Sequence, residues 1–113
     1  MDRRLNAYLY DIVTAIDEIY SFFNAVPMRF DEYQSNLMLR RAIERNVGII
    51  GEAVNHISAD YPNIVITNSR AIIATRNRVI HDYAAITDDI IWAIVINDLP
   101  KLREEVLPLM EKE

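Results

Sequence analysis

Apolar residues recur along this chain in steps of three and four, the spacing of one face of an α-helix. Such stripes cover about residues 5–24, 32–58 and 90–109, and a shorter apolar helix is predicted from about residue 69 to 81. The stripes consist of Leu5, Leu9, Ile12, Ile16, Ile19 and Phe23; of Ile43, Val47, Ile50, Val54 and Ile57; and of Ile91, Val95, Leu99, Leu102, Val106 and Leu109. Strand-like residues run no further than 64–66, so the pattern predicts an all-α, up-and-down bundle of four or five helices.

The helix boundaries follow from polar and proline residues. Residues that commonly cap helices precede the later stripes: Asp31 or Ser35, Asn68 or Ser69, and Thr87 with Asp88 and Asp89. Residues 60–63 read as a turn. Pro100 is expected to kink the last helix because proline removes one backbone hydrogen bond, and Trp92 is expected in or beside the core.

Composition narrows the class of protein. The chain has 113 residues, 51% of them hydrophobic and only two of them glycine, which predicts one packed domain over residues 1–113. It has no cysteine, which excludes disulfides, thiolate zinc sites and a cysteine nucleophile. The first predicted helix carries the charged residues Asp11, Asp17 and Glu18, so it lacks a long uncharged apolar run. Neither a signal peptide nor a membrane span is therefore expected. These features predict a cytoplasmic protein without a membrane partner.

The net charge of −5 is unevenly distributed. Residues 68–83 carry Arg70, Arg76 and Arg78 against Asp82 alone, so a local basic spot lies on an acidic body. Such a spot suits brief contact with one phosphate better than the coating of a duplex, which argues against DNA as a partner. The acidic remainder also suits a protein partner with a basic face.

Few residues suggest catalysis. His56 and His81 fall on different predicted helices, and no histidine pair, carboxylate cluster or glycine-rich phosphate loop is present, so neither a metal nor a cofactor is expected. His56, in the middle of a helix, is interpreted as structural. The stretch from Arg76 to Tyr83 remains, with two arginines, an amide, an imidazole, a carboxylate and a phenol within eight residues.

Helical geometry leaves two arrangements open for this stretch. Positions five apart differ by about 140°, so Arg76 and His81 do not share a face, whereas Asn77 and His81 do. Either Arg76 reaches round to an Asn77–His81 pair, or the helix ends before His81. Both arrangements let a guanidinium and an imidazole meet at one phosphate, where arginine would hold the phosphorane and histidine would move a proton. Metal-independent RNA cleavage needs both an acid and a base, and a two-fold dimer would supply a second histidine.

A structural interpretation competes with this one. Arg76 and Arg78 could pair with surface carboxylates while His81 lies at a helix C-terminus, where a cation gains about 0.3–1 kcal/mol. A second polar stripe lies opposite the apolar side of the second helix, formed by Arg41, Arg45, Gly48, Glu52 and Asn55. Gly48 and Gly51 would let another backbone approach there, although a solvated face also explains these charges.

The string Arg76-Asn77-Arg78-Val79-Ile80-His81-Asp82-Tyr83 resembles the Arg-x4-His-x-Tyr signature of the HEPN superfamily, and in particular its HepT-like toxins. The segments 44–53 and 92–100 are also similar to HepT-type sequence, in the same order, so the resemblance covers about two-thirds of the chain. It implies a helical bundle that forms a homodimer or higher oligomer, with the two motifs facing one cleft.

The resemblance also implies roles for individual residues. It implies a metal-independent endoribonuclease acting on RNA, with transfer RNA among its substrates, in which Arg76 and His81 are catalytic and Asn77 and Asp82 support them. Tyr83 matches the tyrosine that a partner minimal nucleotidyltransferase, the antitoxin, modifies with AMP. Arg45 and Glu52 are candidates for the cleft lining. A noncatalytic subunit that binds this nucleotidyltransferase or a nucleotide is the alternative function.

Overall fold

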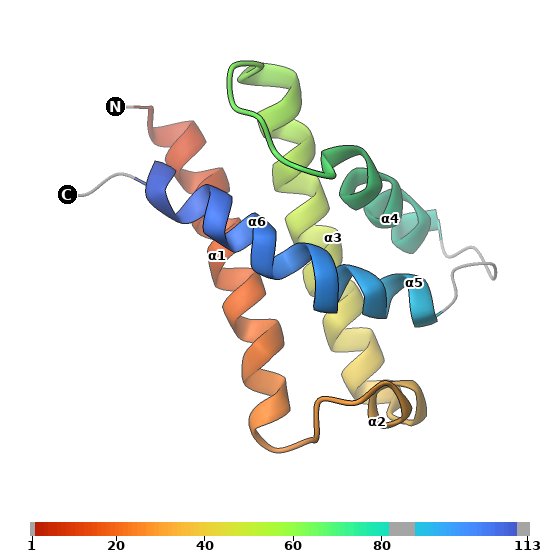
Figure 1. The fold of residues 1–113 in the computed structure, drawn as a ribbon. Coiled ribbons are helices and arrows are strands. Elements are labelled where there is room, and N and C mark those ends of the chain that lie inside the picture. The colour runs from red at the N-terminus through yellow and green to blue at the C-terminus, as the bar shows by residue number, and fades with distance from the viewer. Residues whose placement is uncertain (1, 82–87, 111–113) are drawn as a thin grey trace.

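The computed structural model describes residues 2–81 and 88–110, and for residues 78–81 it describes the backbone alone. Along these residues the chain forms helices and connecting turns without a strand, so the predicted all-α class is confirmed (Figure 1). The α-helices are α1 (Arg3–Ser21), α2 (Phe30–Ser35), α3 (Leu37–Asp60), α4 (Ser69–His81), α5 (Asp88–Ala93) and α6 (Leu99–Val106). The 3-10 turns η1 (Phe22–Asn24) and η3 (Leu107–Leu109) follow α1 and α6, and the π-helical segment η2 (Ile94–Asp98) joins α5 to α6.

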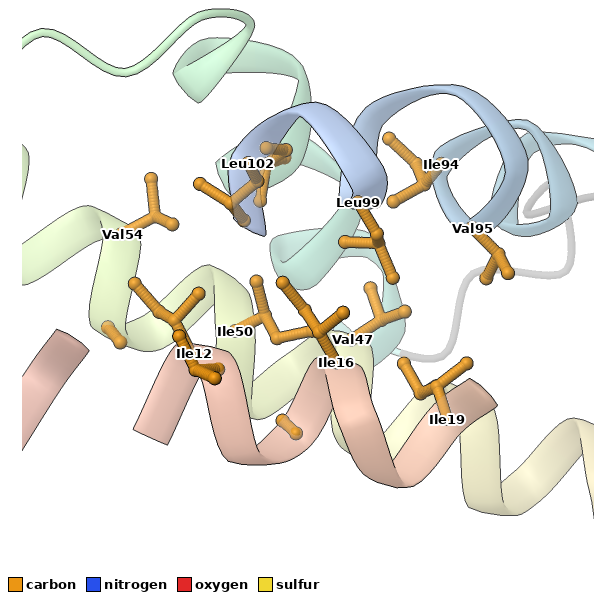
Figure 2. Packing of buried hydrophobic residues seen from close by; sticks show 14 of the residues in the cluster. Ile12, Ile16, Ile19, Val47, Ile50, Val54, Ile94, Val95, Leu99 and Leu102 are labelled. Atoms are coloured by element: carbon orange, nitrogen blue, oxygen red, sulfur yellow. The ribbon is translucent and has the colours of Figure 1, made fainter. Parts of the chain in front are cut away.

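The two longest helices, α1 and α3, lie side by side and antiparallel, and the segment from α5 to α6 crosses in front of them (Figure 1). Their facing stripes are those predicted from the sequence, because Ile12, Ile16, Ile50 and Val54 are fully buried. Leu99 and Leu102 of α6 close over this row in Figure 2. Each such side chain stabilises the fold by about 1.5–3 kcal/mol relative to an exposed one.

The second predicted helix, over residues 32–58, is wrong in one respect. The helix is interrupted at Asn36, so that α2 ends before this residue and α3 begins after it. This residue has an extended backbone (φ −113°, ψ 99°), and its Oδ1 accepts a hydrogen bond from the Leu39 amide at 3.0 Å. Asn36 therefore caps α3, whereas Asp31 and Ser35 lie within α2. The break turns α2 so that Tyr33 is buried.

Tyr33 belongs to an aromatic group that includes Trp92. The two rings stack with centroids 5.3 Å apart, and Phe23 and Phe30 meet Trp92 edge-on. Trp92 is half-buried and packs against the core, as predicted. This group fastens α2 to α5 at the end of the molecule where the α1–α3 connection lies (Figure 1).

The last helical segment is irregular immediately before Pro100, the residue at which a kink is predicted. The π-helical turn covers Ile94–Asp98, and Pro100, which has no N–H to donate, follows directly in the first turn of α6. The Tyr20 hydroxyl donates to the Val95 carbonyl oxygen at 2.7 Å, so α1 satisfies a backbone group of the altered turn. Burial raises the pKa of the Tyr20 phenol to about 12.

The connection from α3 to α4 places the helix that carries the candidate motif. Residues 61–63 form the predicted turn after α3, and Asn68 adopts a left-handed backbone (φ 61°) immediately before α4. Asparagine tolerates this conformation better than most residues. The resulting α4 packs along α3 and runs through His81, as predicted. None of the described helices is long and apolar enough to cross a membrane.

Candidate functional site

Arg76 lies on the side of α4 that faces α3. Its Nη2 donates to Glu52 Oε2, and its Nη1 donates to the Asn77 side-chain oxygen at 2.8 Å. The Arg76 side chain is 22% exposed and the Glu52 side chain 47% exposed, so the guanidinium lies at the edge of the helix pair rather than in the core. The Arg76 Nε is buried and has no hydrogen-bond partner among the described residues. The guanidinium is therefore held from two sides, and Nη1 and Nη2, which carry two hydrogens each, have one acceptor each among the described residues.

Gly51 allows the Arg76 stem to reach this position. A Cβ atom at residue 51 would lie 2.8 Å from Arg76 Cγ and 3.3 Å from the Ile72 carbonyl oxygen, and it would overlap Arg76 Cβ. The predicted close approach of another backbone is thus confirmed at Gly51. At Gly48 no such approach is seen among the described residues, since a Cβ there would meet none of their atoms within 4 Å. Gly51 therefore sets how closely α4 packs on α3 beside the motif.

Glu52 also contacts His56, one turn further along α3. Glu52 Oε1 lies 3.1 Å from His56 Nε2, and the His56 ring stacks on the Tyr8 ring of α1 with centroids 4.9 Å apart and planes 2° apart. A continuous chain of contacts thus links α4 to α1 through α3. The sequence interpretation of His56 as structural missed its connection to Arg76. The four-residue spacing from Glu52 was the available signal.

A groove borders this chain of contacts between α1 and α3. Its volume is about 390 Å³, and its lining consists of Tyr8, Asp11, Gly48, Ile49, Glu52, Ala53 and His56. Arg45 lies about 10 Å before Glu52 along α3 and lines a smaller hollow with Glu18 and Asn46. The structure therefore brings Glu52 to Arg76 and leaves Arg45 exposed beside α1.

The remaining motif residues are described only in part. The backbone of α4 continues through His81, so the alternative in which the helix ends before His81 is not observed. Asn77 and position 81 lie four residues apart in one helix, and Arg76 reaches the Asn77 side chain. The His81 side chain, Asp82 and Tyr83 lie outside the described residues.

Other acidic and histidine residues show no metal-binding arrangement in the part of the chain that the structure describes. No three side chains of the types His, Cys, Asp or Glu gather there closely enough to hold an ion. Two described carboxylates have arginine partners, since Glu52 binds Arg76 and Asp88 binds Arg40 at 3.3 Å. The described hydrogen bonds of Arg76 are donated to Glu52 and to Asn77, and a guanidinium of this kind suits a phosphate oxygen.

Comparison with known proteins relates the chain to one family. The family described as "Ribonuclease HepT-like" matches residues 12–109. A Methanocaldococcus jannaschii protein named "Putative RNase MJ1380" is 33% identical over 108 residues, which cover 92% of this chain and 94% of that protein. A second protein of that organism, "Putative RNase MJ0127", is 34% identical over 96% of this chain and 92% of its own length. "Probable ribonuclease HepT" of Thermococcus cleftensis is 29% identical over 91% of this chain and 93% of its own length. No solved structure matches.

Proposed function

Because this chain belongs to the HepT-like ribonuclease family, we propose that it is an endoribonuclease that cleaves RNA at Arg76 and His81 without a metal ion. The proposal takes residues 1–113 as one catalytic domain. Its main support is the position of Arg76, whose guanidinium is held at the edge of the α3–α4 pair by Glu52 and Asn77, five residues before His81.

The proposed chemistry uses one cation and one proton carrier. Arg76 donates to the nonbridging oxygens of the scissile phosphate and stabilises the extra negative charge of the phosphorane. His81 takes the proton of a ribose 2′-hydroxyl or gives one to the leaving 5′-oxygen. Asn77, which already accepts from Arg76, orients the guanidinium, and Asp82 supports the imidazole.

A two-fold dimer completes this mechanism in the proposal. Each protomer supplies one Arg76–His81 set, so the two histidines can divide proton removal and proton donation between them. A shared cleft would place the second set opposite the first. Arg45 is a candidate for the rim of that cleft because it is exposed on α3, the helix that supports Arg76.

Regulation is the remaining part of the proposal. We assign the chain as the toxin of a toxin–antitoxin pair in the cytoplasm, acting on RNA such as transfer RNA. The antitoxin would be a minimal nucleotidyltransferase that attaches AMP to Tyr83. An AMP group two residues from His81 adds negative charge and bulk, so it competes with the substrate phosphate for Arg76.

Induced expression without a partner tests this function. Wild-type protein is expected to stop growth and shorten small cellular RNAs, while His81→Ala accumulates to the same level without harm. RNA cleavage by the purified wild-type protein is expected to persist in a chelator. Intact RNA in both cultures would refute the ribonuclease proposal and favour a noncatalytic, partner-binding subunit.

A further inference from the structure

Glu52 occupies a central position in the contacts around Arg76. Its two carboxylate oxygens have different partners, Arg76 Nη2 on α4 and His56 Nε2 one turn along α3. Within the described residues it is the carboxylate bound to Arg76. Both partners act as donors when His56 carries its proton on Nε2, so Glu52 is an acceptor held at both ends.

We infer that Glu52 is a positioning residue of the cleavage site, which fixes the Arg76 guanidinium for the substrate phosphate and is itself fixed by His56. The inference rests on the proposed ribonuclease function and extends it to α3 and α1. Glu52 touches Arg76 and not the reacting atoms, so it acts on the reaction through the orientation of that guanidinium.

The geometry of Arg76 explains why an orienting carboxylate matters. Its stem packs against Gly51, the residue before Glu52, where the lack of a Cβ leaves room for it. Its Nη1 donates to the Asn77 side chain. Among the described residues Nη1 and Nη2 have one acceptor each, so we assign their second hydrogens to two parallel bonds with phosphate oxygens. Because such a pair of bonds requires a defined plane, rotation of the guanidinium would weaken transition-state binding more than overall RNA binding.

His56 supplies the second support. Its ring lies flat on Tyr8, which restricts rotation of the imidazole and keeps Nε2 directed at Glu52. Tyr8 and Asp11 of α1 line the adjoining groove, and Arg76 of α4 reaches His56 through Glu52. The contacts Tyr8–His56, His56–Glu52 and Glu52–Arg76 therefore connect α1 to the guanidinium.

The opposite effect of Glu52 is also physically possible, and kinetics separates the two. A carboxylate that merely competes with phosphate for Arg76 would slow cleavage, so its removal would increase the rate and tighten RNA binding. Removal of a positioning carboxylate would instead decrease the cleavage rate. We expect Glu52→Ala to lower kcat about 10- to 100-fold with little change in KM, and Glu52→Gln, which keeps an uncharged acceptor, to lower kcat less.

Two substitutions at His56 separate the hydrogen bond from the ring. His56→Gln keeps a side-chain N–H donor and loses the stack on Tyr8, whereas His56→Phe keeps a ring and loses the donor. We expect His56→Phe to lower kcat about 3- to 10-fold and His56→Gln to retain most of the activity. Equal losses in both variants, or a loss in His56→Gln alone, would overturn the role given to the hydrogen bond.

The experiment measures kcat and KM on total transfer RNA for wild type, Arg76→Ala and the Glu52 and His56 variants. Asp17→Ala is the matched control, because it removes the carboxylate partner of Arg103, 2.8 Å away, at a site remote in sequence from the motif. NMR of the arginine guanidinium groups, with Arg76→Ala used for assignment, reports whether Arg76 rotates faster in Glu52→Ala. Thermal unfolding of each variant identifies any loss caused by misfolding.

The outcomes are distinguishable. Slower cleavage and faster Arg76 rotation in Glu52→Ala, with Asp17→Ala like wild type, support the inference. Unchanged or faster cleavage by Glu52→Ala while Arg76→Ala is inactive overturns it and leaves the proposed function intact. Equal cleavage by Arg76→Ala and wild type refutes the proposed function itself. If no preparation cleaves RNA, unchanged Arg76 rotation in Glu52→Ala overturns the positioning role independently.

Discussion

Substituting alanine for each of the two glycines of α3 tests how the fold positions Arg76. Both positions are helical, so both substitutions gain the same helix propensity, about 0.5–1 kcal/mol. At Gly48 the new Cβ meets no atom of the described residues within 4 Å, whereas at Gly51 it would lie 2.8 Å from Arg76 Cγ. The two variants therefore differ mainly in one steric contact.

The magnitude follows from the atoms involved. Arg76 Cβ and Cγ are close to the α4 backbone and the Ile72 oxygen belongs to it, so relief of the overlap requires movement of the helix. Overpacking of this kind costs about 1–3 kcal/mol. Gly48→Ala should be stabilised by about 0.5–1 kcal/mol, and Gly51→Ala should be less stable than Gly48→Ala by about 1–3 kcal/mol.

Urea unfolding at equilibrium measures this difference, and thermal unfolding should show it as roughly 4 °C per kcal/mol for a domain of this size. Gly51→Ala is also expected to cleave RNA more slowly, because α4 and the Arg76 stem move away from Glu52. Equal stabilisation of both variants would refute the claim that Gly51 sets the spacing between α3 and α4.

Three further predictions concern stability. Asn36→Ala removes the N-cap of α3 and should lower the free energy of unfolding by about 1 kcal/mol, measured in urea. The Tyr20 phenol stabilises the fold fully below its unfolded pKa near 10, and this stability should be lost as pH rises toward its folded pKa of about 12; Tyr20→Phe should therefore show a weaker loss of stability over that pH range. Asp17→Ala breaks the exposed pair with Arg103 and should change the free energy of unfolding by less than about 0.5 kcal/mol in the same assay.

The regular helices were predictable because their signal is local. Apolar residues spaced three and four positions apart indicated which faces of α1, α3 and α6 are buried. Helix α4 begins at Ser69 and ends at His81, as expected. The irregular turns depend on distant partners. The π-helical turn accepts a hydrogen bond from Tyr20, 75 residues away along the chain, and no local pattern specifies that contact. Asn36 was different, since its capping side chain was a readable signal within an otherwise periodic stretch.

The candidate site shows the same division. Arg76 and Asn77 were predicted from their motif and lie in contact, and Glu52, which the family resemblance made a candidate for the cleft lining, contacts Arg76. The link from Glu52 to His56 was not predicted, because a mid-helix histidine has many structural uses. Its orientation here depends on Tyr8, which belongs to another helix. Tertiary packing therefore decides which of the polar residues of α3 face the motif.

The most direct test of the central claim compares two arginines of α4 in one cleavage assay. Arg76 is held at the candidate site, and Arg70 is an exposed residue of the same helix. Purified wild type, Arg76→Ala and Arg70→Ala would be mixed in excess with labelled transfer RNA and EDTA, and single-turnover rates measured. We expect Arg76→Ala to be about 100- to 1,000-fold slower than wild type, and Arg70→Ala, which removes only one charge of the same basic spot, to be slowed far less. Cleavage by Arg76→Ala at the wild-type rate would contradict the central claim.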